Sequence, residues 1–578
     1  MRHRKPLTEL ATHDVINQPP PLGDINLYES DAALRGAVEA GGGGTHHSRL
    51  AEFGERCGAA QTREWARQAN GNSPRQKSFD RFGQRLDEVD FHPAYHRLME
   101  LGLSNGISGC AWSGEPAGHL LHGAMMILMT QADAGVTCPM SMTYASIAAL
   151  REAPKLAGIW EPRVTAQQYD RRSIPASEKN AVTIGMAMTE KQGGSDVRGN
   201  STRAEHAGDG SYILTGHKWF CSAPMSDAFL TLAQAPDGLT CFLVPRWRPD
   251  GERNAIRLMR LKDKLGDRSN ASAEIEYHGA WAQRVGDEGR GVPTIIEMVQ
   301  LTRYDCALGS AGGMRAALVR ALWHATHRRV FGKVLVEQPA MRAVLADLIL
   351  ESEAATALAL RIGAGLDQAA GCGQTASSGR AGVSDLKAVT DREACEQAAA
   401  FVRLATPVAK YWICKRQPGF VYEALECHGG GGYVEDGPMP RLFRQSPLNA
   451  IWEGSGNVIA LDIVRTATQE PDSVTAVLTE LGTAKGRNAH YDAHVEEIKR
   501  LLGEGAVSER TARGFARDVG LGLQAAALHR SAAPPVFDGF CSQRLDPARR
   551  GLLLGELGDA VDQGWLIEQA CRALELDV

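Results

Sequence analysis

The sequence predicts a mainly helical α+β protein in which one β unit lies between helical regions. Apolar residues recur every three or four positions over about residues 46–180 and again after Val292, which is the spacing of helices that bury one face. Residues 181–285 instead form short segments separated by turn signals, as strands do. Because strands and helices do not alternate along the chain, we exclude a doubly wound parallel sheet.

The N-terminal segment is polar and contains Gln18-Pro19-Pro20-Pro21 and a run of four glycines at 41–44, which favour an extended arm. Within the β unit, residues 273–278 alternate apolar and polar side chains. We therefore expect five segments, namely an arm over 1–45, a helical domain over 46–180, a β domain over 181–285, a helical bundle over 286–465 and a C-terminal helical domain over 466–578.

Composition and charge limit the classes of function. The 578 residues include 63 Lys and Arg against 68 Asp and Glu, so the net charge of -5 gives no general attraction to nucleic acid. No run of about 18 apolar residues is present and the N-terminus lacks an apolar signal core, so we expect a cytoplasmic protein without a membrane span. The 12 cysteines form no Cys-x-x-Cys pair and no His-Glu-x-x-His motif occurs, so we expect no metal site.

Two common nucleotide-binding motifs do not fit. Neither glycine tetrad, at 41–44 or 429–432, lies between a strand and a helix as a Rossmann motif requires. Residues 328–333 end in Gly-Lys, but a Walker loop needs glycine where His327 stands and Ser or Thr where Val334 stands. A nucleotide cofactor would therefore be bound by other means.

Two segments of the β unit offer polar and aromatic groups to a ligand. The loop over 186–196 places Thr189 and Ser195 around two glycines, so that it presents hydroxyls and backbone N–H groups; an ordinary turn is the alternative. Phe220 and Ser222 lie two residues apart on a predicted strand and therefore share a face, although Phe220 also suits a core position.

Three segments of the second helical region add further candidates. Arg328 and Phe331 are three residues apart at a predicted helix end, and a glycine run follows at 429–432. Glu453 lies between Trp452 and Gly454, and an apolar wall beside a carboxyl group raises its pKa toward that of a general base. An ordinary surface acid is the alternative for Glu453.

Together these motifs occur in the order and spacing of the acyl-CoA dehydrogenase family, which residues 180–465 resemble. The chain is similar in particular to the alkylation-response, AidB-like flavoprotein branch of that family. The likeness is carried by residues 15–19, 26–28, 189–197, 261–266, 268–272, 302–310 and 451–457, and by the N-terminal arm and the C-terminal segment. It implies an N-terminal helical domain, a central β-barrel, a C-terminal four-helix bundle and an extra C-terminal helical domain.

The resemblance implies FAD between the β unit and the bundle, with part of its diphosphate and adenosine held by a neighbouring subunit of a homotetramer. Thr189 would bind the pyrimidine edge of the flavin and Ser195 its phosphate region. Phe220 would cover the ring and Ser222 would reach toward N5, where the family usually has Trp and Thr. The other implied FAD contacts are Arg328, Phe331, Gln338, Gly429, Gly430, Ser455 and Asn457.

The resemblance also implies the chemistry. Glu453 falls on the position of the family's catalytic base, which removes a proton α to a thioester carbonyl as the β-hydride passes to flavin N5. Arg303 matches an arginine near that base. Gln300 stands where the family commonly has Asp for the CoA portion, and Glu426 stands where it generally has Gln, so neither is assigned as a ligand. The implied substrate is an acyl-CoA or a related small molecule.

The C-terminal segment resembles a region assigned to duplex DNA, and Arg465 falls on an arginine implicated there. Additional phosphate contacts would come from Lys485, Arg487, Lys499, Arg500, Arg510, Arg513, Arg517, Arg549 and Arg550. Residues 466–578 carry 12 Lys and Arg against 17 Asp and Glu, so DNA binding requires the charges to segregate by face. An oligomerisation or lid domain is the alternative.

Three functions therefore remain open from the sequence. The first is an FAD-dependent dehydrogenase that acts on CH–CH groups. The second is a double-stranded DNA-binding flavoprotein that protects DNA in the response to alkylation damage, with weak dehydrogenase activity. The third is an oligomeric scaffold that retains FAD structurally.

Overall fold

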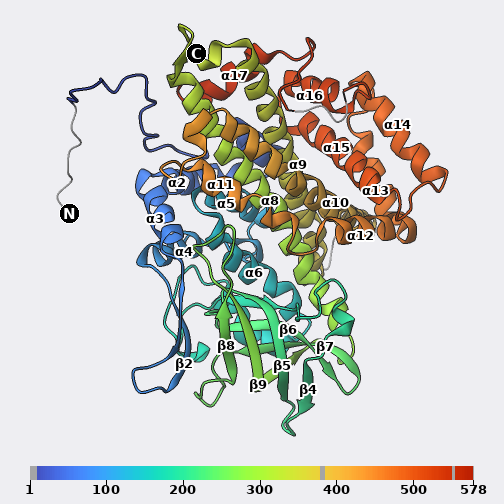
Figure 1. Cartoon of the computed structure of the whole chain (residues 1–578). Coiled ribbons are helices and arrows are strands. Elements are labelled where there is room, and N and C mark those ends of the chain that lie inside the picture. The colour runs from blue at the N-terminus through green and yellow to red at the C-terminus, as the bar shows by residue number, and fades with distance from the viewer. Residues whose placement is uncertain (1–8, 378–384, 550–553, 577–578) are drawn as a thin grey trace.

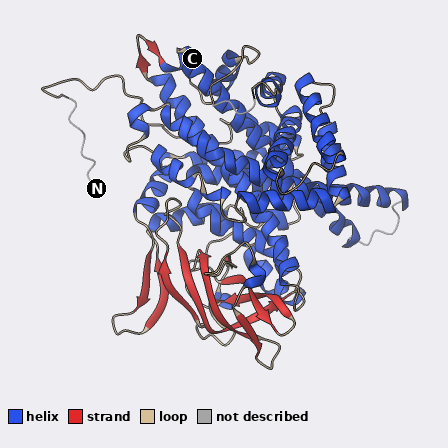
Figure 2. Ribbon diagram, turned by 45° about the vertical axis from the view of Figure 1, so that its right-hand side comes forward, coloured by secondary structure: helices blue, strands red, loops and turns tan. Residues whose placement is uncertain are grey.

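The computed structural model describes residues 9–377, 385–549 and 554–576, and Arg550 lies outside them. The molecule consists of a strand-rich part at one end and a larger helical part, which carries one short hairpin at the opposite end (Figure 1; Figure 2). The predicted fold class is confirmed, because helices precede and follow one central sheet. None of the helices in these described ranges is both long and apolar enough to cross a membrane.

The N-terminal region is helical, and its two central helices are buried on all sides. Every residue of α5 is buried, and most of α6 is buried as well, because both helices pack against the bundle. The helices are α1 (Ala32–Ala40), α2 (His47–Gly58), α3 (Ala60–Gly71), α4 (Pro93–Ser104), α5 (Gly118–Ala132), α6 (Ala134–Leu150) and α7 (Pro154–Val164).

Two elements in this region differ from the sequence-based expectation. Helix α1 lies within the expected arm, and its first turn is capped by Asp31, whose side chain accepts a hydrogen bond from the Leu34 amide at 3.1 Å. A hairpin of β1 (Arg75–Phe79) and β2 (Arg85–Asp90) interrupts the helices. Its strands are largely exposed and rich in charged residues, so they lack the apolar alternation by which strands are recognised.

The central sheet closes into a barrel. Strand β6 pairs with β4 and β7, while β9 pairs with β5 and β7, and the antiparallel β4–β5 pairing completes the ring. Strands β3 and β8 pair with β6 and β9 outside that ring. The strands are β3 (Ile184–Ala187), β4 (Arg203–His206), β5 (Tyr212–Ser222), β6 (Ala228–Ala235), β7 (Gly238–Pro245), β8 (Ile256–Leu261) and β9 (Ser272–Val285).

Three long helices form the centre of the second helical region. Helices α8, α9 and α10 pack against one another, and α5 and α6 pack against α8. A short hairpin of β10 (Arg329–Val330) and β11 (Lys333–Val334) joins α8 to α9. The helices are α8 (Gly291–His327), α9 (Pro339–Ser377), α10 (Asp385–Glu426), α11 (Met439–Gln445) and α12 (Gly456–Gln469).

The C-terminal region is helical, as expected, and covers one side of the bundle (Figure 1). Helix α15 is its central element and packs against both α9 and α10, so the apolar core continues from the bundle into this region. Pro534 and Pro535 lie in the first turn of α16, where proline is tolerated. The helices are α13 (Pro471–Gly482), α14 (Ala489–Gly503), α15 (Ala512–Ser531), α16 (Pro534–Phe540) and α17 (Gln563–Ala573).

Cysteine side chains are almost all removed from solvent. Of the 11 cysteines with described side chains, ten are buried and only Cys395 is partly exposed, and all 11 are free thiols. Burial raises the pKa of each of the ten buried thiols above its ordinary value, to about 12 for Cys138 and Cys221, for example.

Candidate functional site

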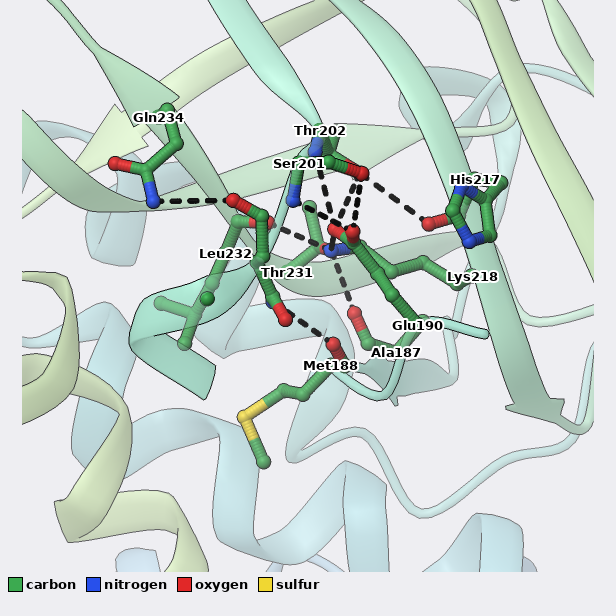
Figure 3. A network of polar contacts seen from close by, with 12 residues as sticks. Ala187, Met188, Glu190, Ser201, Thr202, His217, Lys218, Thr231, Leu232 and Gln234 are labelled. Atoms are coloured by element: carbon green, nitrogen blue, oxygen red, sulfur yellow. Dashed lines mark hydrogen bonds and ion pairs between the residues drawn. The ribbon is translucent and has the colours of Figure 1, made fainter. Parts of the chain in front are cut away.

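The loop that follows β3 is anchored by a carboxylate inside the barrel domain. Glu190 has no solvent exposure and accepts hydrogen bonds from the backbone amides and hydroxyls of Ser201 and Thr202 at 2.6–3.1 Å. The Lys218 ammonium of β5 lies 2.8 Å from Glu190 and also donates to the Leu232 carbonyl of β6 at 2.8 Å (Figure 3). Burial opposes the ionisation of Glu190, but hydrogen bonds from Lys218 and Thr202 outweigh it and hold the pKa of Glu190 below its usual range.

This anchor fixes the two segments that the sequence assigned to the flavin. Thr189 directly precedes Glu190, and its carbonyl accepts a hydrogen bond from the Trp219 amide at 2.8 Å. A Cβ atom at Gly194 would lie only 2.3 Å from the Thr189 hydroxyl, so the loop requires glycine there. Ser195 is exposed at the end of the same loop.

The end of β5 presents an aromatic face and a hydroxyl. The Phe220 side chain is 51% exposed, so it is not the core aromatic that was the alternative interpretation. The Lys262 ammonium lies 4.8 Å from the centre of the Phe220 ring and 3.3 Å from that of Trp219. Ser222 is half-buried, and its hydroxyl lies 3.2 Å from that of Ser272.

Glu453 lies on a left-handed turn just before α12. Its φ of 57° and that of 108° at the following glycine are unusual for the backbone, so neighbouring groups must hold the turn. Arg303 of α8 donates to the Glu453 carbonyl at 3.1 Å, and the buried Lys410 ammonium of α10 donates to the Gly454 carbonyl. The two cations thus hold successive carbonyl groups of the turn.

Among the described residues, the Glu453 carboxylate itself has one hydrogen-bond partner. The Thr302 hydroxyl donates to its Oε2 at 2.8 Å. Burial raises the pKa of Glu453 above its ordinary value, whereas the hydrogen bond from Thr302 and the charges of Arg303 and Lys410 act in the opposite direction. The direction of this shift is the one that the neighbouring Trp452 led us to expect.

Glu453 and the end of β5 face a common apolar cluster. Cys138 of α6 lies beside Ser222 and near enough to Glu453 that, after burial, the Glu453 carboxylate also raises the pKa of the Cys138 thiol. Trp452 and Met188 pack against the same cluster. The structure therefore brings Ser222 and Glu453 to the same junction, between the barrel, α6 and α8.

A second group of sequence-assigned residues lies elsewhere, at the far end of α8. Phe331 is 94% exposed at the tip of the β10–β11 hairpin, which Figure 2 shows at the end of the molecule opposite the barrel. The Arg328 side chain donates to the Asn17 carbonyl at 2.6 Å, and the Gln338 side chain donates to the Val330 carbonyl at 3.0 Å. Gly429 and Gly430 are exposed, with no atom within 4 Å of where a Cβ would stand.

Arg465 and Asn457 lie on α12. Asn457 is exposed, like the preceding Ser455, and its side-chain oxygen lies 3.4 Å from the Arg513 guanidinium.

The Arg465 side chain is 60% exposed and lies 3.1 Å from Asp462. Asp462 also contacts Arg303 at 2.8 Å and Arg403 at 3.3 Å. Burial opposes the ionisation of Asp462, but the charges of Arg303 and Arg403 outweigh it and lower its pKa.

Three residues of this site were not found from the sequence. Thr302 and Lys410 contact the Glu453 turn from positions 151 and 44 residues away, and Asp462 meets Arg303 across 159 residues. No local pattern signals such contacts. Thr302 is adjacent to the assigned Arg303, and Asp462 lies near the assigned Arg465. The sequence therefore indicated this part of the chain but not the contacts themselves.

Comparison with protein-family models matches three parts of the chain. Residues 17–171 match the Adaptive response protein AidB N-terminal domain, residues 185–280 the acyl-CoA dehydrogenase middle domain and residues 289–468 the acyl-CoA dehydrogenase C-terminal domain. AidB of Escherichia coli (strain K12) is 42% identical over 94% of this chain and 96% of its own. Acyl-CoA dehydrogenase family member 11 of Caenorhabditis elegans is 33% identical over 78% of this chain and 72% of its own.

The chain belongs to the acyl-CoA dehydrogenase family. Its N-terminal domain and its similarity to AidB place it with the AidB homologues of that family. Solved structures agree with this assignment. C. elegans ACDH-11 in complex with C11-CoA superposes with a TM-score of 0.79 at 26% identity, and the match covers 100% of this chain and 96% of that one. The Bd2924 apo-form gives a TM-score of 0.77 at 27% identity over 89% of this chain and 100% of its own.

We expect Lys218→Met to lower the free energy of unfolding by about 3–5 kcal/mol, because it leaves the buried Glu190 carboxylate without its counter-charge. Urea denaturation followed by circular dichroism measures the change. Lys499→Met is the matched control, since Lys499 pairs with Glu496 at the surface at 2.8 Å and should change the free energy of unfolding by less than about 1 kcal/mol. Equal effects of the two substitutions would show that the buried pair does not anchor the barrel loop.

Proposed function

We propose that this member of the acyl-CoA dehydrogenase family is an FAD-dependent oxidoreductase that oxidises the CH–CH bond next to the thioester of an acyl-CoA or a related substrate. The proposal is carried by Glu453, a carboxylate with a raised pKa that is held on a strained turn at the junction where Ser222 also lies. The bound ligand named for C. elegans ACDH-11 supports a thioester of CoA as the substrate class.

The residues at the junction fit FAD. Phe220 offers a half-exposed ring for stacking, and the hydroxyls of Thr189, Ser195 and Ser222 offer hydrogen bonds to a polar edge or a phosphate. When bound, FAD supplies the acceptor for the hydride. An acyl-CoA dehydrogenase from Bacillus anthracis, solved in complex with FAD, matches this chain with a TM-score of 0.62 at 16% identity. The fold therefore accommodates this cofactor.

The chain's own residues supply the proton transfer. Thr302 holds Oε2 of Glu453, which leaves Oε1 to take the proton from the carbon α to the thioester carbonyl. Arg303 and Lys410 keep the turn in place by holding its two carbonyl groups, so the carboxylate has a fixed direction. The Trp452 side chain is partly buried beside the base and limits the access of water.

We further propose that the distant group of assigned residues binds the FAD of a neighbouring subunit in a homotetramer. Phe331 and Tyr433 are 94% and 82% exposed, which is unusual for aromatic side chains without a partner. Gly429 and Gly430 leave open space in which a diphosphate can approach the backbone. Assembly would thus complete the cofactor site from two copies of the chain.

A DNA-binding function is the second candidate, and it rests on the similarity to AidB and on Arg465, which remains 60% exposed. Several members of the expected basic stripe are paired with acids instead. Lys499 pairs with Glu496, and Arg500 pairs with Glu497, as neighbours on one helix. Arg517 likewise pairs with Asp518. The stripe therefore offers fewer free charges to phosphates than its count of cations predicts.

We expect Glu453→Gln to retain FAD but to slow the bleaching of the flavin by acyl-CoA by about 100-fold or more, because general-base catalysis of proton abstraction is lost. Anaerobic stopped-flow absorbance with a series of acyl-CoAs measures the rate. Glu496→Gln, an exposed acid on α14, is the control and should leave the rate unchanged. Bleaching of the Glu453→Gln protein at the wild-type rate would contradict the assignment of the base, and a colourless wild-type protein that takes up no flavin would contradict the cofactor.

We expect kcat/KM to fall as the pH drops through the raised pKa of Glu453, since only the carboxylate form accepts a proton. Thr302→Val removes a hydrogen bond that favours this form, so the pKa rises further and the acid limb moves up by about one pH unit. The pH dependence of kcat/KM measures the shift. Thr326→Val on the same helix is the control, because that hydroxyl's hydrogen-bond partners among the described residues, Leu322, Trp323 and His327, all belong to its own helix. An acid limb that stays in place would show that Thr302 does not act on the base.

We expect Arg465→Ala to weaken binding to duplex DNA and to reduce the slope of log K against log[salt] by about one, as the loss of one phosphate contact predicts. Fluorescence anisotropy with a labelled duplex at several salt concentrations measures both quantities. Lys77→Ala, on the exposed face of the β1–β2 hairpin, is the control. If the wild-type protein shows no affinity at low salt, the DNA-binding function is excluded.

A further inference from the structure

A cleft of about 1190 Å³ lies between α3, the end of α8, the loop after β8 and α11, apart from the Glu453 junction. Ligand pockets in proteins commonly have volumes of about 300–1,000 Å³, so this cleft is large enough for a nucleotide-sized molecule. The N-terminal segment forms part of its wall through Pro19, Pro21 and Leu22. Neither the family comparisons nor the proposed dehydrogenase activity assigns it a role.

Cationic side chains converge on this cleft from separate parts of the chain. The six arginines in its lining are Arg63, Arg67, Arg268, Arg320, Arg441 and Arg444. Four carboxylates also line it, and two of them pair with cations, Glu64 with Arg67 at 2.7 Å and Glu435 with Arg444. Burial raises the pKa of a third, Asp267, to about 7. Near neutral pH only part of the Asp267 population is therefore negatively charged.

Two of the arginines lack adequate partners inside the protein. The Arg320 side chain is partly buried, and within the described parts of the chain no group accepts a hydrogen bond from its guanidinium or forms an ion pair with it. The Arg441 side chain is 15% exposed, its closest carboxylate oxygen is 3.7 Å away on Asp133, and its Nη1 is buried without a hydrogen-bond partner. Burial and the positive charges of Arg441 and Arg63 lower the pKa of Arg320 to about 9.

An uncompensated guanidinium next to a second one is costly unless an anion joins them. The guanidinium group presents a planar fork of donors that matches the oxygens of a phosphate. Two imidazoles, His324 and His428, also line the cleft, with ring centres 4.7 Å apart. Burial lowers the pKa of His324 to about 4, so this ring is neutral at physiological pH and offers a hydrogen bond without adding charge.

The N-terminal segment lies between the cleft and the Arg328 loop, which is one of the proposed contacts with a neighbour's FAD. Asn17 accepts from Arg328 through its carbonyl, and the next contact along the segment is the Pro20 carbonyl, which accepts from Trp323 at 2.8 Å. Arg63 then donates to the Leu22 carbonyl at 2.6 Å. The segment therefore runs along the end of α8 from the Arg328 loop to the wall of the cleft.

We propose that this cleft binds a small phosphate-bearing ligand, held by Arg320 and Arg441, at a site separate from the flavin. The ligand class is a diphosphate, either free or as part of a nucleotide. The proposal goes beyond the dehydrogenase activity and does not depend on it, because the arginines concerned lie outside the Glu453 junction.

The test is isothermal titration of the flavin-loaded protein with inorganic pyrophosphate and with ADP, while the flavin absorbance is monitored. We expect binding of pyrophosphate without release of flavin, and at least about tenfold weaker binding by Arg320→Met. Arg67→Met is the matched control, since its guanidinium is already neutralised by Glu64, and it should change the affinity less than about threefold. Tighter binding of ADP than of pyrophosphate would identify a nucleotide as the source of the diphosphate, and equal binding would identify the free anion.

A second measurement separates a ligand-binding role from a structural one. Without ligand, Arg320→Met should have a melting temperature equal to or above that of the wild type, because it removes an unpaired, partly buried charge beside a second guanidinium. Pyrophosphate should raise the melting temperature of the wild type but not that of the variant. The proposal is overturned if pyrophosphate does not bind, if sulfate at equal ionic strength stabilises equally, if flavin is released on binding, or if Arg320→Met melts below the wild type and binds unchanged.

Discussion

A carboxylate and an ammonium that are both removed from solvent, Glu190 and Lys218, connect the strands on which the candidate flavin site is built. An ion pair in such a place is costly unless additional donors satisfy it, and Ser201 and Thr202, just before β4, supply them. The loop that carries Thr189 and the strand that carries Phe220 are thereby joined at one point. Neither segment can shift without leaving a charge unpaired inside the barrel domain.

The proposed base depends on a second meeting point of distant segments. Groups from α8 and α10 hold the turn that carries the base and precedes α12. Asp462 extends this arrangement to the surface, because it contacts Arg303 on one side and Arg465 on the other. The arginine beside the base and the arginine proposed for DNA therefore share one counter-charge. A ligand phosphate at Arg465 would compete with Asp462 for that guanidinium. The two candidate functions are therefore coupled electrostatically through Asp462.

The fold was largely predictable from the sequence, since helical and strand periodicities differ clearly on either side of residues 181 and 285. The β1–β2 hairpin was missed because charged residues obscure its alternation. Helix α1 was missed because this short capped helix lies between a proline-rich stretch and a run of four glycines. For the site, the apolar neighbours of Glu453 predicted the direction of its pKa shift. Thr302, Lys410 and the cleft arginines could not be predicted, because their positions depend on how distant segments pack. The pairing of Lys499 with Glu496 and of Arg500 with Glu497 could be predicted, because residues three apart on a helix are neighbours.

The burial of ten cysteines has a consequence for the durability of the chain. Thiols react with electrophiles through the thiolate form, and both burial and a raised pKa suppress that form. Among the 11 cysteines whose side chains are described, methylating agents and peroxides therefore meet ten thiols that react slowly, and exposed thiols around the protein would be consumed first. These ten thiols are thus suited to remain unmodified while more exposed thiols around them react.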